Sequence, residues 1–363
     1  MPSCRFFSHI PTPVKWRRAI AQRNLAVQIS SLLIHHKNGI SILRSRTSLL
    51  PRPLPSSLLR RILKQTHSNP DVSFRFFLFA RAHLSFNPDL VDFSTIAAIL
   101  VAGDQFSSVA HLLYPVLRSH PAPALLDSLF YSSNYFFHSS ATTVLSKLLN
   151  FVLEIYSTLP SLCGAIETFK RIKDFQVVPS KRSCNALLDL LCSSGEFRIA
   201  WLVYASAVRI GAMMDGGSWT TLARLLCKEG KLHKAEMLLN SGFCRRASCY
   251  DLVIKCYARK RHFSLAIRVL NGMEERGFRT RLSTLSSILD ESCRFGDFSL
   301  AGLMIKEMIV GGLLPVFPSL DFDWIVRRFC ELGKTFAAML IFEKAQRRNL
   351  ELMSACTCVS SGH

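Results

Sequence analysis

One small residue recurs along this chain at a spacing close to 35 residues. From residue 165 onward the successive steps are 35, 35, 31, 35 and 37 residues, and the positions are Ala165, Ala200, Ala235, Ala266, Ala301 and Ala338. Two further columns keep the same phase. A glycine lies five residues before four of these alanines and a cysteine lies eight residues before them: Gly195, Gly230, Gly296, Gly333, and Cys192, Cys227, Cys293, Cys330. Independent columns that agree on one period indicate a repeat architecture, in which neighbouring units bury one continuous core.

Each repeat unit is predicted to contain two helices. In the clearest unit, apolar residues at 184, 187, 188, 191 and 192 form one helical face. Gly195 then interrupts the chain, and a second helical face runs from Phe197 to Ala207 before Gly211. Neither helix can bury its apolar face alone, so the units must stack. We therefore predict an all-α solenoid of helix-turn-helix repeats, with six units over residues 147–352 and a degenerate helical repeat region over residues 71–146.

Two segments resemble a known repeat family. Arg182-Ser-Cys-Asn-Ala-Leu-Leu-Asp-Leu-Leu-Cys-Ser-Ser-Gly-Glu-Phe-Arg-Ile-Ala200 is similar to a pentatricopeptide repeat, and so is the segment from Gly217 to Ala235. The Leu-Cys-x-x-Gly run with Ala five residues beyond the Gly carries the resemblance, which is closest to the plain 35-residue class of plant organellar members. It implies a right-handed superhelix of helical hairpins. Tetratricopeptide repeats compete less well, because their signature appears only as a half match at Trp219-Thr-Thr-Leu222.

The resemblance implies binding of single-stranded RNA, at about one base per repeat through two or three side chains. It places one reading residue in the first turn of each first helix and a second at the residue that closes the repeat. The predicted RNA-binding residues are Asn150, Ser180, Asn185, Asp215, Thr220, Arg246, Asp251, Arg281 and Ser286. Asp323 and Pro318 complete the two columns.

The predicted pairs differ in what they imply. Asn185 with Asp215 resembles a uracil-preferring pair, and Asn150 with Ser180 resembles a pyrimidine pair with cytosine first. The remaining pairs depart from the family pattern: Thr220/Arg246, Asp251/Arg281 and Ser286/Pro318. The two arginines could contact phosphate, which gives sequence-independent affinity, or could be solvated linker charges. Asn, Ser, Thr and Asp at a helix start are also ordinary capping residues, and this alternative stays open at every position.

The charge is concentrated at the N-terminus. The chain carries 45 Lys+Arg against 25 Asp+Glu, a net charge of +20, and residues 1–70 hold twelve of the basic residues and no acidic one. The remaining 293 residues therefore carry 33 basic and 25 acidic residues, or +8. An acid-free segment that is rich in Arg and Ser is typical of an organellar transit peptide. We predict a transit peptide or disordered basic leader over residues 1–70, a mitochondrial location with the chloroplast as the alternative, and an unstructured tail over residues 353–363.

No catalytic or cofactor motif is evident. The sequence has no H-x-E with P-C-x-x-C, no G-x-S-x-G, no H-E-x-x-H and no C-x-x-C, so we predict a protein without enzymatic activity, cofactor or metal. The longest apolar run, residues 95–103, is nine residues and too short to span a membrane. We expect a monomer that binds single-stranded organellar RNA, with other organellar RNA-processing proteins as further candidate partners. The competing hypothesis is a protein-interaction scaffold built on the same repeats.

Overall fold

The computed structural model of this protein describes residues 13–36, 39–45, 50–213, 215–242, 246–314 and 322–346. Every regular element among these residues is a helix. The all-α class predicted from the repeat pattern is therefore confirmed. The predicted tail at residues 353–363 and the closing residue Pro318 lie outside the described residues.

The chain divides into two compact units, described separately here. Unit 1 comprises residues 1–194 and 199–213, and unit 2 comprises residues 195–198 and 214–363. The helices of unit 1 are α1 (Pro13–His35), α2 (Gly39–Ser45), α3 (Ser56–Thr66), α4 (Pro70–His83), α5 (Leu90–Ala102), α6 (Phe106–Ser119), α7 (Ala122–Phe137), the short 3-10 helix η2 (His138–Ser140), α8 (Ala141–Thr158), α9 (Leu162–Asp174), α10 (Lys181–Ser193) and most of α11 (Phe197–Arg209).

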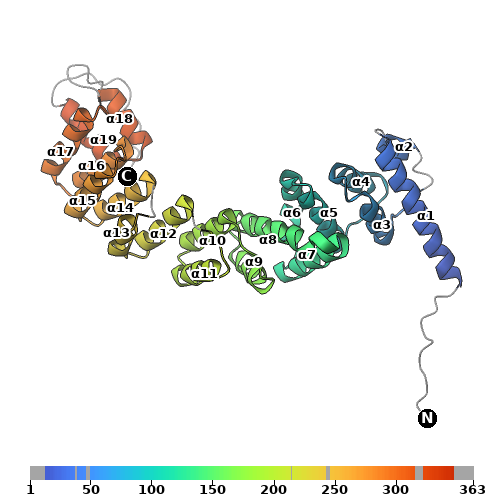
Figure 1. Ribbon diagram of the computed structural model, residues 1–363. Coiled ribbons are helices and arrows are strands. Elements are labelled where there is room, and N and C mark those ends of the chain that lie inside the picture. Colours follow the sequence, from blue (N-terminus) through green and yellow to red (C-terminus); the bar gives the residue numbers. More distant parts are fainter. Residues whose placement is uncertain are drawn as a thin grey trace, which may run out of the picture. The chain divides into compact units, whose positions relative to one another are not determined.

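Unit 2 is made of helical hairpins that follow one another along the chain (Figure 1). Its helices are α12 (Gly216–Lys228), α13 (Leu232–Asn240), α14 (Ala247–Arg259), α15 (Phe263–Glu275), α16 (Leu282–Arg294), α17 (Phe298–Val310), α18 (Phe322–Glu331) and α19 (Thr335–Gln346). The first helix α14 packs against its own partner α15 and against the first helices α12 and α16. In unit 1, α8 packs in the same way against α9 and α10. Stacking of first helix on first helix is the repeat packing that the sequence predicts.

The alanine column lies in the core. All six alanines, from Ala165 to Ala338, are at most 1% exposed. A methyl side chain at this position allows the second helix of each repeat to approach its neighbours closely, and a larger side chain would have to displace them.

The glycine column lies in the turn between the two helices of a repeat. Gly195, Gly230, Gly296 and Gly333 have φ between +65° and +84°, a left-handed conformation that favours glycine. The repeat that follows a step of only 31 residues has Arg261 at this position, and Arg261 adopts the same conformation with φ of +63°. A left-handed backbone costs a residue other than glycine roughly 1–2 kcal/mol, so the shape of the repeat here outweighs the preference of the residue.

The N-terminal segment differs from the prediction of a disordered leader. Residues 13–35, 39–45 and 56–66 are helical, and α3 is part of the core because Leu58, Leu59, Ile62 and Leu63 are fully buried. Arg60 of α3 also donates a hydrogen bond of 2.7 Å to Asp92, a fully buried carboxylate at the start of α5. The targeting role of residues 1–70 stays a prediction, but the packed helical region begins before residue 70. The apolar face of α3 was not recognised in the sequence because the segment was interpreted from its basic composition.

None of the helices in the described part of the chain is long and apolar enough to cross a membrane.

Candidate nucleic-acid interface

The first predicted reading pair is held together by hydrogen bonds. Asn150 lies on α8, and its side-chain Oδ1 accepts a hydrogen bond of 2.7 Å from the backbone N–H of Ser180. The same oxygen accepts a second bond of 2.6 Å from the hydroxyl of Ser183. Its Nδ2 donates to the carbonyl oxygens of Ser146 at 2.9 Å and Val178 at 3.4 Å. The amide of Asn150 therefore links α8 to the start of the next first helix, α10.

Ser180 has a structural role of its own at this position. It is the N-cap of α10, and its hydroxyl oxygen accepts a hydrogen bond of 3.0 Å from the backbone N–H of Ser183. An N-cap serine typically stabilises a helix by about 1 kcal/mol. The Ser180 side chain therefore caps a helix, and it is also one of the side chains predicted to contact a base.

A cavity of about 520 Å³ lies beside the Asn150/Ser180 pair. Two ion pairs border it: Lys147 Nζ lies 2.6 Å from Asp104 Oδ1, and Arg182 Nε lies 2.9 Å from Glu154 Oε2. Burial raises the pKa of Glu154, and the charge of Arg182 opposes that rise. The cavity is lined by Phe106, Ser107 and Ala110 of α6, by Ser146, Lys147, Asn150, Phe151 and Glu154 of α8, and by Ser180 and Arg182. The rings of Phe106 and Phe151 are 5.2 Å apart between centroids. This mixture of aromatic, amide and cationic groups suits a nucleotide.

In unit 2 the predicted pair Asp251/Arg281 is also brought together, by charge. Arg281 Nη2 lies 3.6 Å from Asp251 Oδ2. The other carboxylate oxygen, Oδ1, accepts a hydrogen bond from the hydroxyl of Thr284. The Arg281 side chain remains 54% exposed, so the ion pair is open to solvent and to ions.

The Thr220/Arg246 pair meets through the first turn of α12. The Thr220 hydroxyl donates a hydrogen bond of 2.8 Å to the carbonyl oxygen of Gly216. The Arg246 side chain lies against the same glycine, because a Cβ at residue 216 would come within 2.6 Å of Arg246 Nε. Glycine at this position thus lets the closing arginine approach the turn that carries Thr220.

Asn185 belongs to unit 1 and Asp215 to unit 2. Asp215 is the N-cap of α12: its Oδ1 accepts hydrogen bonds from the backbone N–H of Ser218 at 2.9 Å and from the Ser218 hydroxyl at 3.1 Å. The Oδ1 of Asn185 is buried and accepts no hydrogen bond from any residue that the structure describes. A buried acceptor without a donor costs free energy, which a bound ligand could recover if it reached this oxygen.

Ser286 is placed differently from the other predicted readers. It is fully buried in α16, and its hydroxyl has no hydrogen-bond partner among the described residues. A base cannot reach this side chain in the present structure, so Ser286 is left out of the interface. The repeat period placed Ser286 at the position of the other readers, but it could not show that neighbouring residues bury this part of α16.

One column of residues that contact the predicted readers was not among the predicted RNA-binding residues. The third residues of α10, α14 and α16 are Ser183, Cys249 and Thr284, and all three are buried. Ser183 and Thr284 donate to Asn150 and Asp251, and Cys249 Sγ lies 3.2 Å from Thr220 Oγ1. The signal in the sequence is a small polar or sulfur-containing residue two positions before the readers Asn185, Asp251 and Ser286.

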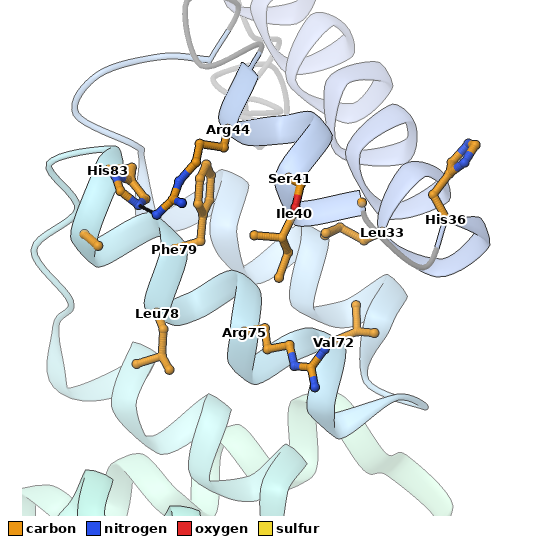
Figure 2. Close-up of a pocket in the computed structure, with 12 residues that line it drawn as sticks. Leu33, His36, Ile40, Ser41, Arg44, Val72, Arg75, Leu78, Phe79 and His83 are labelled. Atoms are coloured by element: carbon orange, nitrogen blue, oxygen red, sulfur yellow. Dashed lines mark hydrogen bonds between the residues drawn. The ribbon is translucent and has the colours of Figure 1, made fainter.

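A further cavity of about 500 Å³ lies in the N-terminal part of unit 1 (Figure 2). It is enclosed by α1, α2 and α4, with Ile40 and Phe79 among its apolar walls. Arg44 Nη2 lies 2.9 Å from His83 Nε2 at one end, and Arg75 lies at another. No acidic residue is among the described residues that line this cavity, so its charge suits an anionic group.

No group of three or more His, Cys, Asp or Glu side chains is placed to hold a metal ion within the described ranges.

Comparison with known proteins identifies related sequences. The family model described as PPR repeat matches residues 217–241 and 248–278. A pentatricopeptide repeat-containing protein of Arabidopsis thaliana is 27% identical over 331 residues, which cover 91% of this chain and 55% of that protein. The chain thus spans about half the length of this relative. A mitochondrial pentatricopeptide repeat-containing protein of the same plant is 32% identical over 90 residues, which cover 24% of this chain and 22% of that protein.

Two solved structures are also similar. The maize pentatricopeptide repeat protein PPR10 is 17% identical with a TM-score of 0.46, covering 86% of this chain and 47% of that chain. The PPR domain of Arabidopsis thaliana protein-only RNase P 1, solved in complex with tRNA, is 17% identical with a TM-score of 0.41, covering 47% of this chain and 92% of that domain.

Proposed function

The chain belongs to the pentatricopeptide repeat family, and from this premise we propose that it binds single-stranded RNA through the first helices of its repeats. Repeats of this kind bind about one base each. The observation that carries the proposal is the placement of the predicted reading pairs. Ser180 N–H contacts Asn150 at 2.7 Å and Arg281 contacts Asp251 at 3.6 Å, each across two successive first helices.

The proposed mechanism is occupancy of RNA rather than its cleavage. A bound chain of helical repeats would cover a short single-stranded stretch, and so protect an end, keep a hairpin open or admit another factor. Each of these effects needs binding free energy alone and no reacting group. We propose no enzymatic step.

Phosphate contacts would supply part of the affinity. Arg246 and Arg281 are both exposed beside a predicted reader, where a backbone phosphate of the bound RNA would pass. Outside residues 1–70 the chain carries an excess of eight basic residues, 33 against 25 acidic. Such contacts make binding dependent on salt but carry no sequence information.

We propose that this occurs in an organelle, and in the mitochondrion in particular. Two matched relatives in Arabidopsis thaliana are named as mitochondrial proteins. The acid-free N-terminal segment supports the same location. Expression of the full chain with a C-terminal fluorescent tag in plant cells, beside mitochondrial and chloroplast markers, tests it.

The test of RNA binding is a selection with the full chain from randomised single-stranded RNA at near-physiological salt. We expect an enriched short motif that contains adjacent pyrimidines, and we expect Asn185→Ala to relax it. Binding that depends on salt but enriches no motif would mean that the chain binds RNA through its basic surface and does not select bases. Absence of binding would overturn the proposal.

A protein-interaction scaffold is the second candidate, and one observation favours it. The second helix α17 exposes three large apolar side chains: Phe298 at 63%, Leu303 at 54% and Val310 at 74%. Leu303 and Val310 are seven residues apart and so lie on one face of the helix, and exposed apolar residues gathered on one face are typical of a protein-binding surface. Loss of a partner protein from tagged full-length chain carrying Leu303→Ser, with RNA binding unchanged, would support this function in addition to RNA binding.

A further inference from the structure

The third residue of a first helix contacts the predicted reader of the preceding repeat in three repeats. The atoms are Ser183 Oγ and Asn150 Oδ1 at 2.6 Å, Cys249 Sγ and Thr220 Oγ1 at 3.2 Å, and Thr284 Oγ1 and Asp251 Oδ1 at 2.5 Å. Each of these third residues is at most 1% exposed, whereas the three readers are half-buried. A buried contact that recurs in phase with the repeat is unlike a chance surface hydrogen bond. We call these three residues, Ser183, Cys249 and Thr284, the support column.

In unit 1 the contact decides which end of the Asn150 amide faces inward. The backbone N–H of Ser180 can only donate, so the atom facing it must be the oxygen of the amide. The hydroxyl of Ser183 donates to the same oxygen. Both lone pairs of Oδ1 are therefore engaged. The NH2 group donates to the Ser146 carbonyl oxygen at 2.9 Å and, over a longer 3.4 Å, to the Val178 carbonyl oxygen. The N–H that faces Val178 is therefore the part of the amide that a ligand could take over. An NH2 group selects a base edge that carries an acceptor, such as a pyrimidine carbonyl.

In unit 2 the support column holds a reader that presents hydrogen-bond acceptors, whereas Asn150 in unit 1 presents a donor. The Thr284 hydroxyl donates to Oδ1 of Asp251, which is an acceptor-only group when ionised. Arg281 Nη2 lies 3.6 Å from the other oxygen. The carboxylate held in this way offers only lone pairs to a ligand. It selects a base edge that carries N–H donors, such as an exocyclic amino group.

We propose that the support column positions the readers, so that the third residue of each first helix sets which hydrogen-bonding groups the preceding repeat presents to its base. This inference rests on the proposed binding of single-stranded RNA. It assigns Ser183 and Thr284 as positioning residues, which act on the base through Asn150 and Asp251. It also predicts opposite polarity at the two positions: acceptor-bearing bases opposite Asn150 and amino-bearing bases opposite Asp251.

The test is RNA selection with full-length variants at the Thr284 position. Thr284→Val keeps the shape of the side chain and removes the hydroxyl, and Thr284→Ser restores a hydroxyl. Thr168→Val is the matched control, because the Thr168 hydroxyl is equally buried but bonds only to Gly164 within its own helix α9. Circular dichroism and urea unfolding of each variant establish that the compared proteins are folded.

We expect Thr284→Val to lower base discrimination about three- to tenfold at one motif position, the loss of one oriented hydrogen bond. The other positions should keep their preferences. Thr284→Ser should restore the wild-type motif, and Thr168→Val should leave it unchanged. A motif that is the same in wild type and folded Thr284→Val overturns the positioning role while leaving RNA binding intact. A wild-type chain that enriches no motif overturns the proposed sequence-selective reading and this inference together.

Ser183→Ala in unit 1 provides the second variant should Thr284→Val fail to fold. Ser180 N–H still holds the Asn150 oxygen in this variant, so the expected loss of discrimination is smaller and falls at the position opposite Asn150. Loss at a position different from the one that Asn150→Asp alters would contradict the proposal.

Discussion

The Asn150/Ser180 pair of unit 1 and the Asp251/Arg281 pair of unit 2 occupy the same two positions of the repeat, yet different interactions hold them. Asn150 takes part in a neutral network with a backbone N–H and a buried hydroxyl. Asp251 combines one buried hydroxyl with a solvent-open ion pair to Arg281. Repeat geometry therefore brings a reader and the next closing residue together. The side-chain types decide whether the contact mainly stabilises the fold, through buried hydrogen bonds, or mainly sets the local surface charge, through an exposed ion pair. Buried hydrogen bonds and exposed ion pairs differ in strength, which makes the comparison testable.

The largest expected effect is on stability, at Asn150. Asn150→Ala leaves the Ser180 N–H without its acceptor and removes the shorter of the two hydrogen bonds open to the buried Ser183 hydroxyl, the other being to the Ser180 carbonyl oxygen at 3.0 Å. We expect the free energy of unfolding to fall by about 1–3 kcal/mol. Asp251→Asn keeps an oxygen for Thr284 and loses only an exposed ion pair, so its expected loss is below about 1 kcal/mol. Urea unfolding of both variants measures the difference. Equal losses would show that the two networks do not differ in strength.

The closing residues should differ next, through helix capping. Ser180 accepts a hydrogen bond from the backbone N–H of Ser183, whereas Arg281 at the same position of α16 makes no side-chain capping bond. We expect Ser180→Ala to cost about 1 kcal/mol of stability, and Arg281→Ala to change it by less than about 0.5 kcal/mol. Thermal and urea unfolding test both. An Arg281→Ala loss as large as that of Ser180→Ala would contradict this view of the two closing residues.

The ion pair should matter more for RNA binding than for stability. Asp251→Asn removes the charge that faces Arg281. We expect affinity for single-stranded RNA to rise a few-fold at low salt and the slope of log affinity against log salt to steepen by roughly one contact. Asp297→Asn, which makes the same charge change at the N-cap of the second helix α17, is the control. A rise of equal size in the control would mean that net charge alone is responsible.

The smallest effect concerns Glu154, beside the unit 1 cavity. Burial raises the pKa of Glu154 in the folded protein, so the native state holds this proton more tightly than the unfolded state does. Stability from this group therefore falls as pH rises through the window between the unfolded pKa, about 4.3, and the higher folded value. We expect Glu154→Gln to stabilise the protein at pH 7 by less than about 1 kcal/mol, and the difference to disappear near pH 4. Urea unfolding at both pH values, with the exposed Glu275→Gln as control, decides the sign.

Much of the fold could be predicted because periodicity reports burial directly. The alanine column predicted the closely packed second helices, and all six alanines are buried. The glycine column predicted the turns, and Arg261, which replaces glycine in one repeat, also adopts the left-handed conformation. The N-terminal helices were missed, because basic composition outweighed the apolar spacing of residues 58–63 in the interpretation.

The candidate site could be predicted only in part. The position of each residue within the repeat was enough to predict that Asn150 lies beside Ser180 and Asp251 beside Arg281. Phase could not distinguish Ser286, which is fully buried, from the half-buried Thr220 at the equivalent position. Burial of a first-turn residue depends on the helices packed over it, which lie elsewhere in the sequence.

The sequence by itself determined the repeat: two helices per unit, a small residue where second helices pack and a glycine-type turn between helices. These features follow from local backbone preferences and from apolar spacing, both of which are properties of short segments. Tertiary packing sets which atom of the Asn150 amide is held by Ser183 and which side chain faces Asp251. Hydrogen-bond partners are chosen by the distance between stacked helices, and that distance is set by packing of the core rather than by any single segment.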